Sequence, residues 1–94
     1  MIRSLKGRVA KAIAEDEKPK GFPPELVTAA QNRLAMIEAA KRLDDLRSPP
    51  GNRLHALKGA RRGQHAIRIN DQWRVCFEWR DGDAENVEIC DYHN

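Results

Sequence analysis

The last residues of the chain include a histidine, a carboxylate and a phenol that could take part in proton transfer. An imidazole has an unperturbed pKa of about 6.5, so His93 can accept or donate a proton near neutral pH. Asp91 could orient that imidazole or transfer a proton itself, and Tyr92 could stack on a base or donate its hydroxyl to phosphate. His55 is a second candidate imidazole. These residue types are the ones that metal-free cleavage of RNA requires.

Positive charge is concentrated in the segment before these residues. The net charge is only +3, but residues 46–70 contain no acidic residue, whereas residues 71–94 contain seven. The basic residues of the first segment are Arg47, Arg53, Lys58, Arg61, Arg62 and Arg68. Fixed Lys and Arg side chains bind nucleic-acid phosphate by releasing its counterions. A solvated basic loop is an equally good explanation for the charge alone.

Two of the cations are suited to hold the phosphate that is cut. Arg74 can bind two phosphate oxygens with its planar guanidinium, and Lys58 can act as a point charge. Cleavage also needs a base for the 2′-hydroxyl proton and an acid for the leaving 5′-oxygen. The sequence leaves open how His93, Asp91 and His55 share these two roles.

Each candidate also has a plainer interpretation. A lone histidine near a chain end is most often exposed to solvent, and Arg74, which lies beside Glu78 on one strand face, could simply form cross-strand pairs. Asp91 could only cap or bridge to a neighbouring strand, and Tyr92 could only complete the rim of the core. The alternation of Trp73 and Trp79 with other apolar residues indicates packing.

The first half of the chain predicts helices. Residues 2–5 fit a short strand, a brief helix around Val9 and Ile13 follows, and residues 15–24 fit a loop. A longer helix is expected from Pro24 to about Leu46, with a possible kink before its end. Its buried stripe consists of Val27, Ala30, Leu34 and Ile37.

The second half predicts an antiparallel meander of three strands at residues 65–70, 73–79 and 86–92, joined by short turns. Alternation gives the strands one apolar face against the helix, formed by Ile67, Ile69, Trp73, Val75, Phe77, Trp79, Val87 and Ile89. The opposite, open face would carry Arg68, Arg74 and Tyr92 and could receive an RNA strand.

Length and composition limit the class of protein. Ninety-four residues fit a single α+β domain spanning residues 1–94, with its helices on one face of a small, mainly antiparallel sheet. The chain has no long apolar run, so we expect a cytoplasmic protein without membrane association. Cys76 and Cys90 lack metal-ligand spacing, so they are expected to be reduced, and neither a metal nor another cofactor is expected.

Three stretches together resemble the HigB branch of the RelE/ParE toxin superfamily. They are LHALKG at residues 54–59, RRGQHAIRINDQWRVCFEW at residues 61–79 and VEICDYH at residues 87–93. The family has a lysine-glycine turn, then a hairpin with the pattern I-x-I/V-x-x-x-W-R, and ends on D-Y-H. Relatives often carry aromatic residues in place of Gln64 and His65, so His65 receives no role from the resemblance.

The resemblance implies a RelE-like fold with a curved sheet and a ribosome-dependent endoribonuclease that cuts translated mRNA. The family's catalytic positions fall on His55, Lys58, Asp91, Tyr92 and His93, and its basic position falls on Arg74. Arg53, Arg61, Arg62 and Arg68 are additional candidates for RNA phosphate. A HigA-like antitoxin with a helix-turn-helix is implied as the partner that neutralises the toxin, and the pair would bind operator DNA.

Two other functions compete with this one. A ParE-like toxin of the same fold inhibits DNA gyrase by binding, but such toxins generally lack the D-Y-H ending. A nucleic-acid-binding regulator would use the basic segment for phosphate alone, with steep salt dependence and no toxicity.

Overall fold

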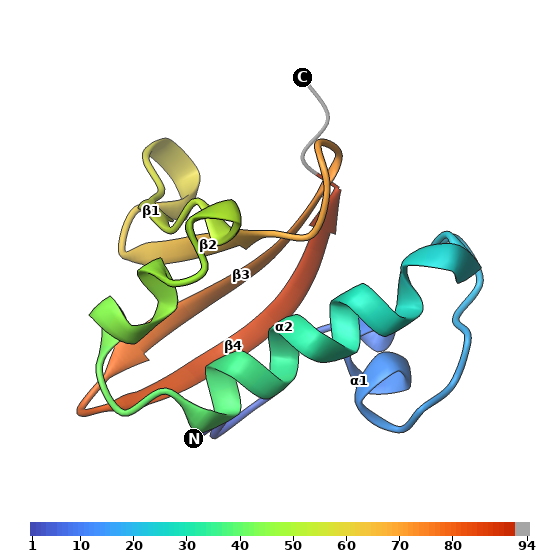
Figure 1. Cartoon of the computed structure of the whole chain (residues 1–94), viewed down its shortest axis with the longest axis horizontal. Coiled ribbons are helices and arrows are strands. Elements are labelled where there is room, and N and C mark those ends of the chain that lie inside the picture. Colours follow the sequence, from blue (N-terminus) through green and yellow to red (C-terminus); the bar gives the residue numbers. More distant parts are fainter. Residues whose placement is uncertain (92–94) are drawn as a thin grey trace.

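Two N-terminal helices lie against one face of a four-stranded antiparallel sheet, as the computed structural model shows (Figure 1). The structure describes residues 1–91. The elements in chain order are α1 (Arg8–Ala14), η1 (Pro24–Leu26), α2 (Val27–Ala39), η2 (Leu43–Arg47), η3 (Pro50–Asn52), β1 (His55–Ala56), η4 (Gly59–Arg61), β2 (Gln64–Arg68), β3 (Trp73–Arg80) and β4 (Asp83–Asp91), where η denotes a 3-10 helix. The α+β class and the position of the helices on one face of the sheet are confirmed.

The strands lie in the order β1-β2-β3-β4, and each neighbouring pair is antiparallel. The predicted meander is therefore confirmed, although β4 begins at Asp83 rather than near residue 86. The register between β3 and β4 shifts between Cys76 and Glu78, and such an irregularity adds curvature to a strand pair. β1 was not predicted, and it adds a short edge strand in which His55 lies opposite Ala66.

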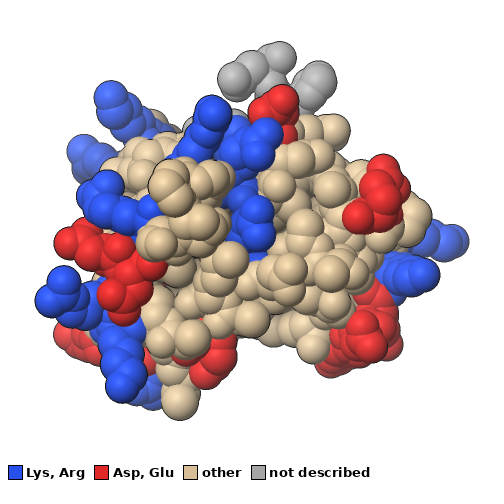
Figure 2. Space-filling model, in the orientation of Figure 1, with Lys and Arg blue, Asp and Glu red and all other residues tan. Residues whose placement is uncertain are grey.

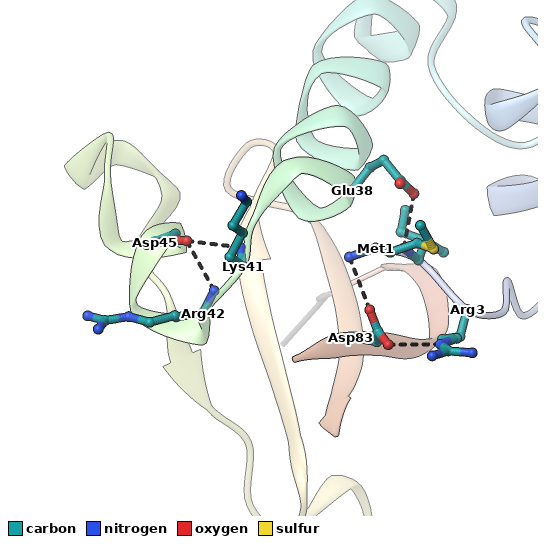
Figure 3. Close-up of polar contacts among 8 residues, drawn as sticks. Met1, Arg3, Glu38, Lys41, Arg42, Asp45 and Asp83 are labelled. Atoms are coloured by element: carbon teal, nitrogen blue, oxygen red, sulfur yellow. Dashed lines mark hydrogen bonds and ion pairs between the residues drawn. The ribbon is translucent and has the colours of Figure 1, made fainter. Parts of the chain in front are cut away.

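The helix predicted to reach about Leu46 ends at Ala39, and η2 begins only after a break. The carboxylate of Asp45 accepts hydrogen bonds from the backbone N–H groups of Lys41 (2.9 Å) and Arg42 (3.1 Å) (Figure 3). Local bonds of this kind compete with the helical hydrogen-bond ladder, so the chain turns here. The same two bonds hold the pKa of Asp45 below its ordinary value.

The N-terminal segment lies along the outer edge of β4. It forms two isolated parallel bridges there, Ile2 with Ala84 and Leu5 with Val87, so the expected strand is present only as single bridges. Arg3 Nε lies 2.8 Å from the Asp83 carboxylate, and the amino group of Met1 lies 3.4 Å from it (Figure 3). The backbone N–H of Ile2 donates to Glu38 of α2 at 3.0 Å. The segment therefore joins the helical layer to the sheet.

The main hydrophobic core lies between the helices and the sheet. It contains the predicted stripe of α2 and the predicted apolar face of the strands, with Ile13 added from α1. Phe22, in the loop before α2, packs edge-on against Trp73 with ring centroids 4.9 Å apart. Both predicted core faces are confirmed, and they leave the opposite face of the sheet for other contacts.

Ile37→Ala should lower the free energy of unfolding by about 2–5 kcal/mol, because Ile37 is fully buried and its truncation leaves a cavity. Ala35→Ser, on the exposed side of the same helix, should stay within about 0.5 kcal/mol of the wild type. Urea denaturation followed by circular dichroism measures both. Equal stability of Ile37→Ala and the wild type would mean that this core face is assigned wrongly.

Candidate nucleic-acid interface and catalytic site

A second, smaller apolar cluster lies on the face of the sheet opposite the helices. Leu57, which follows β1, packs there against Ala66 of β2, Cys76 of β3 and Cys90 of β4, and all four residues are buried. The backbone N–H of Leu57 donates to the carbonyl of Gln64 at 2.9 Å. The prediction that this face is open is therefore wrong for its middle, because the segment after β1 folds back over the strands.

Lys58 directly follows the buried Leu57 and is itself exposed. The turn η4 begins at the next residue, Gly59, whose φ of +65° is a conformation that favours glycine. The backbone N–H of Arg61 closes the turn on the carbonyl of Lys58 at 3.3 Å. Within residues 1–91 the ammonium group of Lys58 has no salt-bridge partner. The turn thus presents a cation at the edge of the second cluster.

Arg61 joins the same turn to β4. Its Nη1 lies 2.6 Å from Oε1 of Glu88 and 3.0 Å from Oε1 of Gln64. The hydrogen bond with Glu88 raises the pKa of the Arg61 guanidinium, and burial opposes that effect. Arg62, the next residue, is exposed.

Three arginines gather around Asp71 in the turn between β2 and β3. Arg68 Nη2 lies 2.6 Å from the Asp71 carboxylate. This hydrogen bond lowers the pKa of Asp71, and the charges of Arg68, Arg53 and Arg74 lower it further. Arg74 also donates to the backbone carbonyl of Asn70 in the same turn. Positive charge is therefore held at this end of the sheet.

Two imidazoles occupy different surroundings on β1 and β2. His55 is exposed, and its Nδ1 donates to the carbonyl of Arg53 at 2.9 Å. The strand register places His55 beside Ala66, on the face of the second cluster. His65 instead packs against Phe77, with ring centroids 6.4 Å apart. Burial lowers the pKa of His65 below its ordinary 6.5, and the charges of His55 and Arg47 add to this shift.

Asp91 is exposed at the end of β4, opposite Trp73. Its Oδ2 accepts a hydrogen bond from Gln72 Nε2 at 3.2 Å, so the end of β4 is tied to the turn between β2 and β3. Tyr92 and His93, which were predicted to act with Asp91, lie outside the described residues.

Cys90 connects the Lys58 turn with Arg74. It packs against Leu57 in the second cluster, and it lies directly opposite Arg74 in the register of β3 and β4. The neighbouring Cys76 thiol and burial raise the pKa of Cys90 above its ordinary value, so Cys90 stays protonated. Both cysteines are free thiols, as expected. Lys58 and Arg74 consequently border the same second cluster.

The surface around the second cluster is rich in cations. Figure 2 shows Lys and Arg side chains gathered in its upper left part, over the region of β1 and η4 in Figure 1. Fixed cations with a nearby imidazole and carboxylate can bind a phosphate and move protons beside it. No group of three or more metal-ligating side chains occurs among residues 1–91. In the same part of the chain, no helix combines the length and apolar character needed to cross a membrane.

Comparison with known proteins assigns the chain to a family. Residues 4–93 match the family described as RelE-like toxin of type II toxin-antitoxin system HigB. The chain belongs to the HigB family of RelE-like toxins. Membership in a type II toxin-antitoxin system implies an antitoxin partner. The resemblance carried by the lysine-glycine turn, the hairpin and the D-Y-H ending is thereby confirmed.

Relatives and solved structures agree with this assignment. Toxin HigB-1 of Vibrio cholerae is 39% identical over 75 residues, which cover 80% of this chain and 79% of that protein. Endoribonuclease HigB of Proteus vulgaris is 33% identical over 93 residues, which cover 99% of this chain and 100% of that protein. Two crystal structures of YafQ from E. coli, one of them a mutant, each cover 97% of this chain and 93% of their own, with TM-scores of 0.64 and 0.57 at 12% and 13% identity. The YafQ likeness concerns the fold alone and confirms the RelE-like architecture.

Sequence reasoning missed two acidic residues of the site. Glu88 was not among the predicted site residues, and its pairing with Arg61 was not foreseen. Asp71 was not predicted to belong to the site either, although it contacts Arg68. The sequence did contain a signal for Glu88. Alternation along the strand at residues 86–92 places this carboxylate on the open face that was predicted to carry Arg68 and Arg74.

His65→Gln should make stability less dependent on pH. The pKa of His65 is lower in the folded chain than in the unfolded one, so the unfolded chain binds more protons and the free energy of unfolding falls as the pH drops below about 6.5. Urea midpoints at about pH 7.5 and about pH 5.5 should differ less in His65→Gln than in the wild type. His55→Gln removes an exposed imidazole whose charge adds to the His65 shift less than burial does, so it should reduce the pH dependence less than His65→Gln. An unchanged pH dependence in His65→Gln would show that this imidazole is not buried as described.

Proposed function

We propose that this toxin is an endoribonuclease that cleaves translated mRNA on the ribosome and thereby inhibits translation. The observation that carries the proposal is the placement of Lys58 and Arg74 around the second cluster, beside the end of β4. Tyr92 and His93 follow β4 directly in the chain. The Proteus vulgaris relative, which is named an endoribonuclease and aligns with 99% of this chain, supports the same activity here.

The proposed reaction is attack of the RNA 2′-hydroxyl on the adjacent phosphorus, without a metal ion. A base takes the hydroxyl proton, the 2′-oxygen bonds to phosphorus, and the 5′-oxygen leaves with a proton from an acid. The products are a 2′,3′-cyclic phosphate and a 5′-hydroxyl. Lys58 and Arg74 stabilise the additional negative charge of the intermediate. His93 serves as base or acid with Asp91 as its partner, and His55 is the complementary candidate.

The remaining site residues bind RNA around the scissile phosphate. Arg53 and Arg62 are exposed cations and are suited to backbone phosphates. Arg68 is held by Asp71, whose side chain is 95% exposed, so an RNA phosphate can replace that carboxylate. Tyr92 stacks on a base or donates to phosphate.

The proposed partners follow from the family. We expect a HigA-like antitoxin with a helix-turn-helix domain, encoded by a neighbouring reading frame, that neutralises the toxin in the cytoplasm. The toxin–antitoxin pair would bind operator DNA through that domain. The absence of such a gene next to the toxin gene would count against this part of the proposal.

Lys58→Ala should reduce mRNA cleavage on programmed ribosomes by about 100-fold or more, because one cation that stabilises the transition state is lost. His93→Ala should reduce it by about 100- to 10,000-fold, the usual contribution of a general acid or base. Lys11→Ala, an exposed lysine of α1, is the control and should cut normally. Cleavage is measured by primer extension, and the cyclic phosphate end by its resistance to ligation.

Other outcomes would contradict the proposed function. Cleavage at the wild-type rate by both Lys58→Ala and His93→Ala would exclude these residues from the chemistry. Toxicity with DNA damage and intact transcripts would indicate gyrase inhibition instead. Salt-dependent RNA binding without toxicity would indicate a regulator.

A further inference from the structure

We infer that Arg61 and Glu88 form a positioning pair that holds the Lys58 turn over the second apolar cluster, and that Arg61 does this instead of binding RNA phosphate. The inference rests on the proposed endoribonuclease activity. The two residues are 27 positions apart, and their ion pair joins η4 to β4 at 2.6 Å. β4 is the strand that ends at Asp91, so the pair links the lysine of the proposed site to the strand that leads into its C-terminal residues.

The pair reaches across the sheet. Glu88 lies opposite Cys76 of β3, and Cys76 lies opposite Ala66 of β2. Neighbouring strands are about 4.8 Å apart, so β4 lies about 10 Å from β2. Gln64 of β2 accepts a second hydrogen bond from the same guanidinium nitrogen at 3.0 Å. The arginine side chain therefore connects the turn to an inner strand and to the strand at the far side of the sheet.

Lys58 lies between two anchors of the turn. Leu57 before it is buried in the second cluster, and Arg61 after it is held by β4. Gly59 and Gly63 have φ values of +65° and +96°, and both are positions where the chain changes direction. Without Arg61, the turn would be held only at its two ends, by Leu57 and by the start of β2 at Gln64, and it could pivot about Gly59. The second anchor removes that freedom and fixes where the Lys58 backbone lies.

The position of Glu88 argues against a phosphate-binding role for Arg61. A carboxylate at 2.6 Å neutralises the guanidinium and repels a phosphate that approaches it. The Glu88 side chain is only 18% exposed and that of Arg61 41%, so solvent weakens this pair less than it weakens the surface pair of Arg47 and Asp44, which are 70% and 66% exposed. Arg62, without a salt-bridge partner in the described part of the chain, is the better phosphate ligand.

Glu88→Gln separates the two roles because they predict opposite effects. If Glu88 positions the turn, its neutralisation should lower the single-turnover cleavage rate on programmed ribosomes about 10- to 100-fold, while ribosome binding stays as tight as in the wild type. If Arg61 binds phosphate, removal of the competing carboxylate should raise the affinity or the rate, and that result would overturn the inference. Glu85→Gln removes the same charge from the same strand, where Glu85 contacts Arg80 at 3.7 Å, and should cut at the wild-type rate.

Exchange of the two charges tests the pair directly. Arg61→Glu alone places two carboxylates together, so it should cut more slowly than Glu88→Gln. The double variant Arg61→Glu/Glu88→Arg restores opposite charges and should regain at least about 10-fold over Arg61→Glu. No recovery in a double variant whose circular dichroism and urea midpoint match the wild type would overturn the inference.

The failures of the two proposals can be told apart. A wild-type protein that cuts no mRNA on ribosomes would defeat the proposed function. If the wild type cuts and Lys58→Ala does not, a wild-type rate in Glu88→Gln would defeat the positioning pair alone.

Discussion

The burial of Leu57 against the outer face of the sheet is the interaction on which the site depends. The helices cover one side of the central strands and Leu57 covers the other, so neighbouring residues of β3, Val75 and Cys76, are both fully buried. Burying a leucine side chain contributes about 1.5–3 kcal/mol. That contribution matters here because β1 has only two paired residues and could not hold the turn by its own hydrogen bonds. Lys58 follows Leu57 directly, so its place is set by an apolar contact.

Two further contacts position the site. One lies in the segment that leads into β1, and the other comes from helix α2. Asn52 is fully buried, and its side-chain amide donates to the carbonyls of Leu46 (3.2 Å) and Ser48 (3.4 Å). These bonds fix the path of the loop that enters β1. Arg33 of α2 donates to the carbonyl of Arg68 at 2.8 Å, at the end of β2 where the arginines gather. The core side of the fold thus sets the position of both basic parts of the proposed site.

The sequence predicted those parts of the fold that depend on periodicity. The stripe of α2 and the alternation of β2, β3 and β4 reflect burial on one face, which repeats along the chain and can be counted. β1 could not be found in this way, because two residues have no period. The fold-back of Leu57 and the pairing of Arg61 with Glu88 join distant segments, and no local pattern records such contacts. The break after Ala39 depends on a side-chain bond from Asp45 that competes with an otherwise continuous helical pattern.

The burial of the carboxylate distinguishes the two ion pairs at the proposed interface. Asp71 and Glu88 each lie 2.6 Å from an arginine, so distance alone would give them the same role. Asp71 is almost fully exposed, and water compensates for its loss of a partner, so Arg68 can exchange it for a phosphate at little cost. Glu88 is largely shielded, and separating it from Arg61 would leave a carboxylate with few water contacts. The acidic residues of this basic face therefore divide into one that can give up its arginine to RNA and one that keeps its arginine in the scaffold.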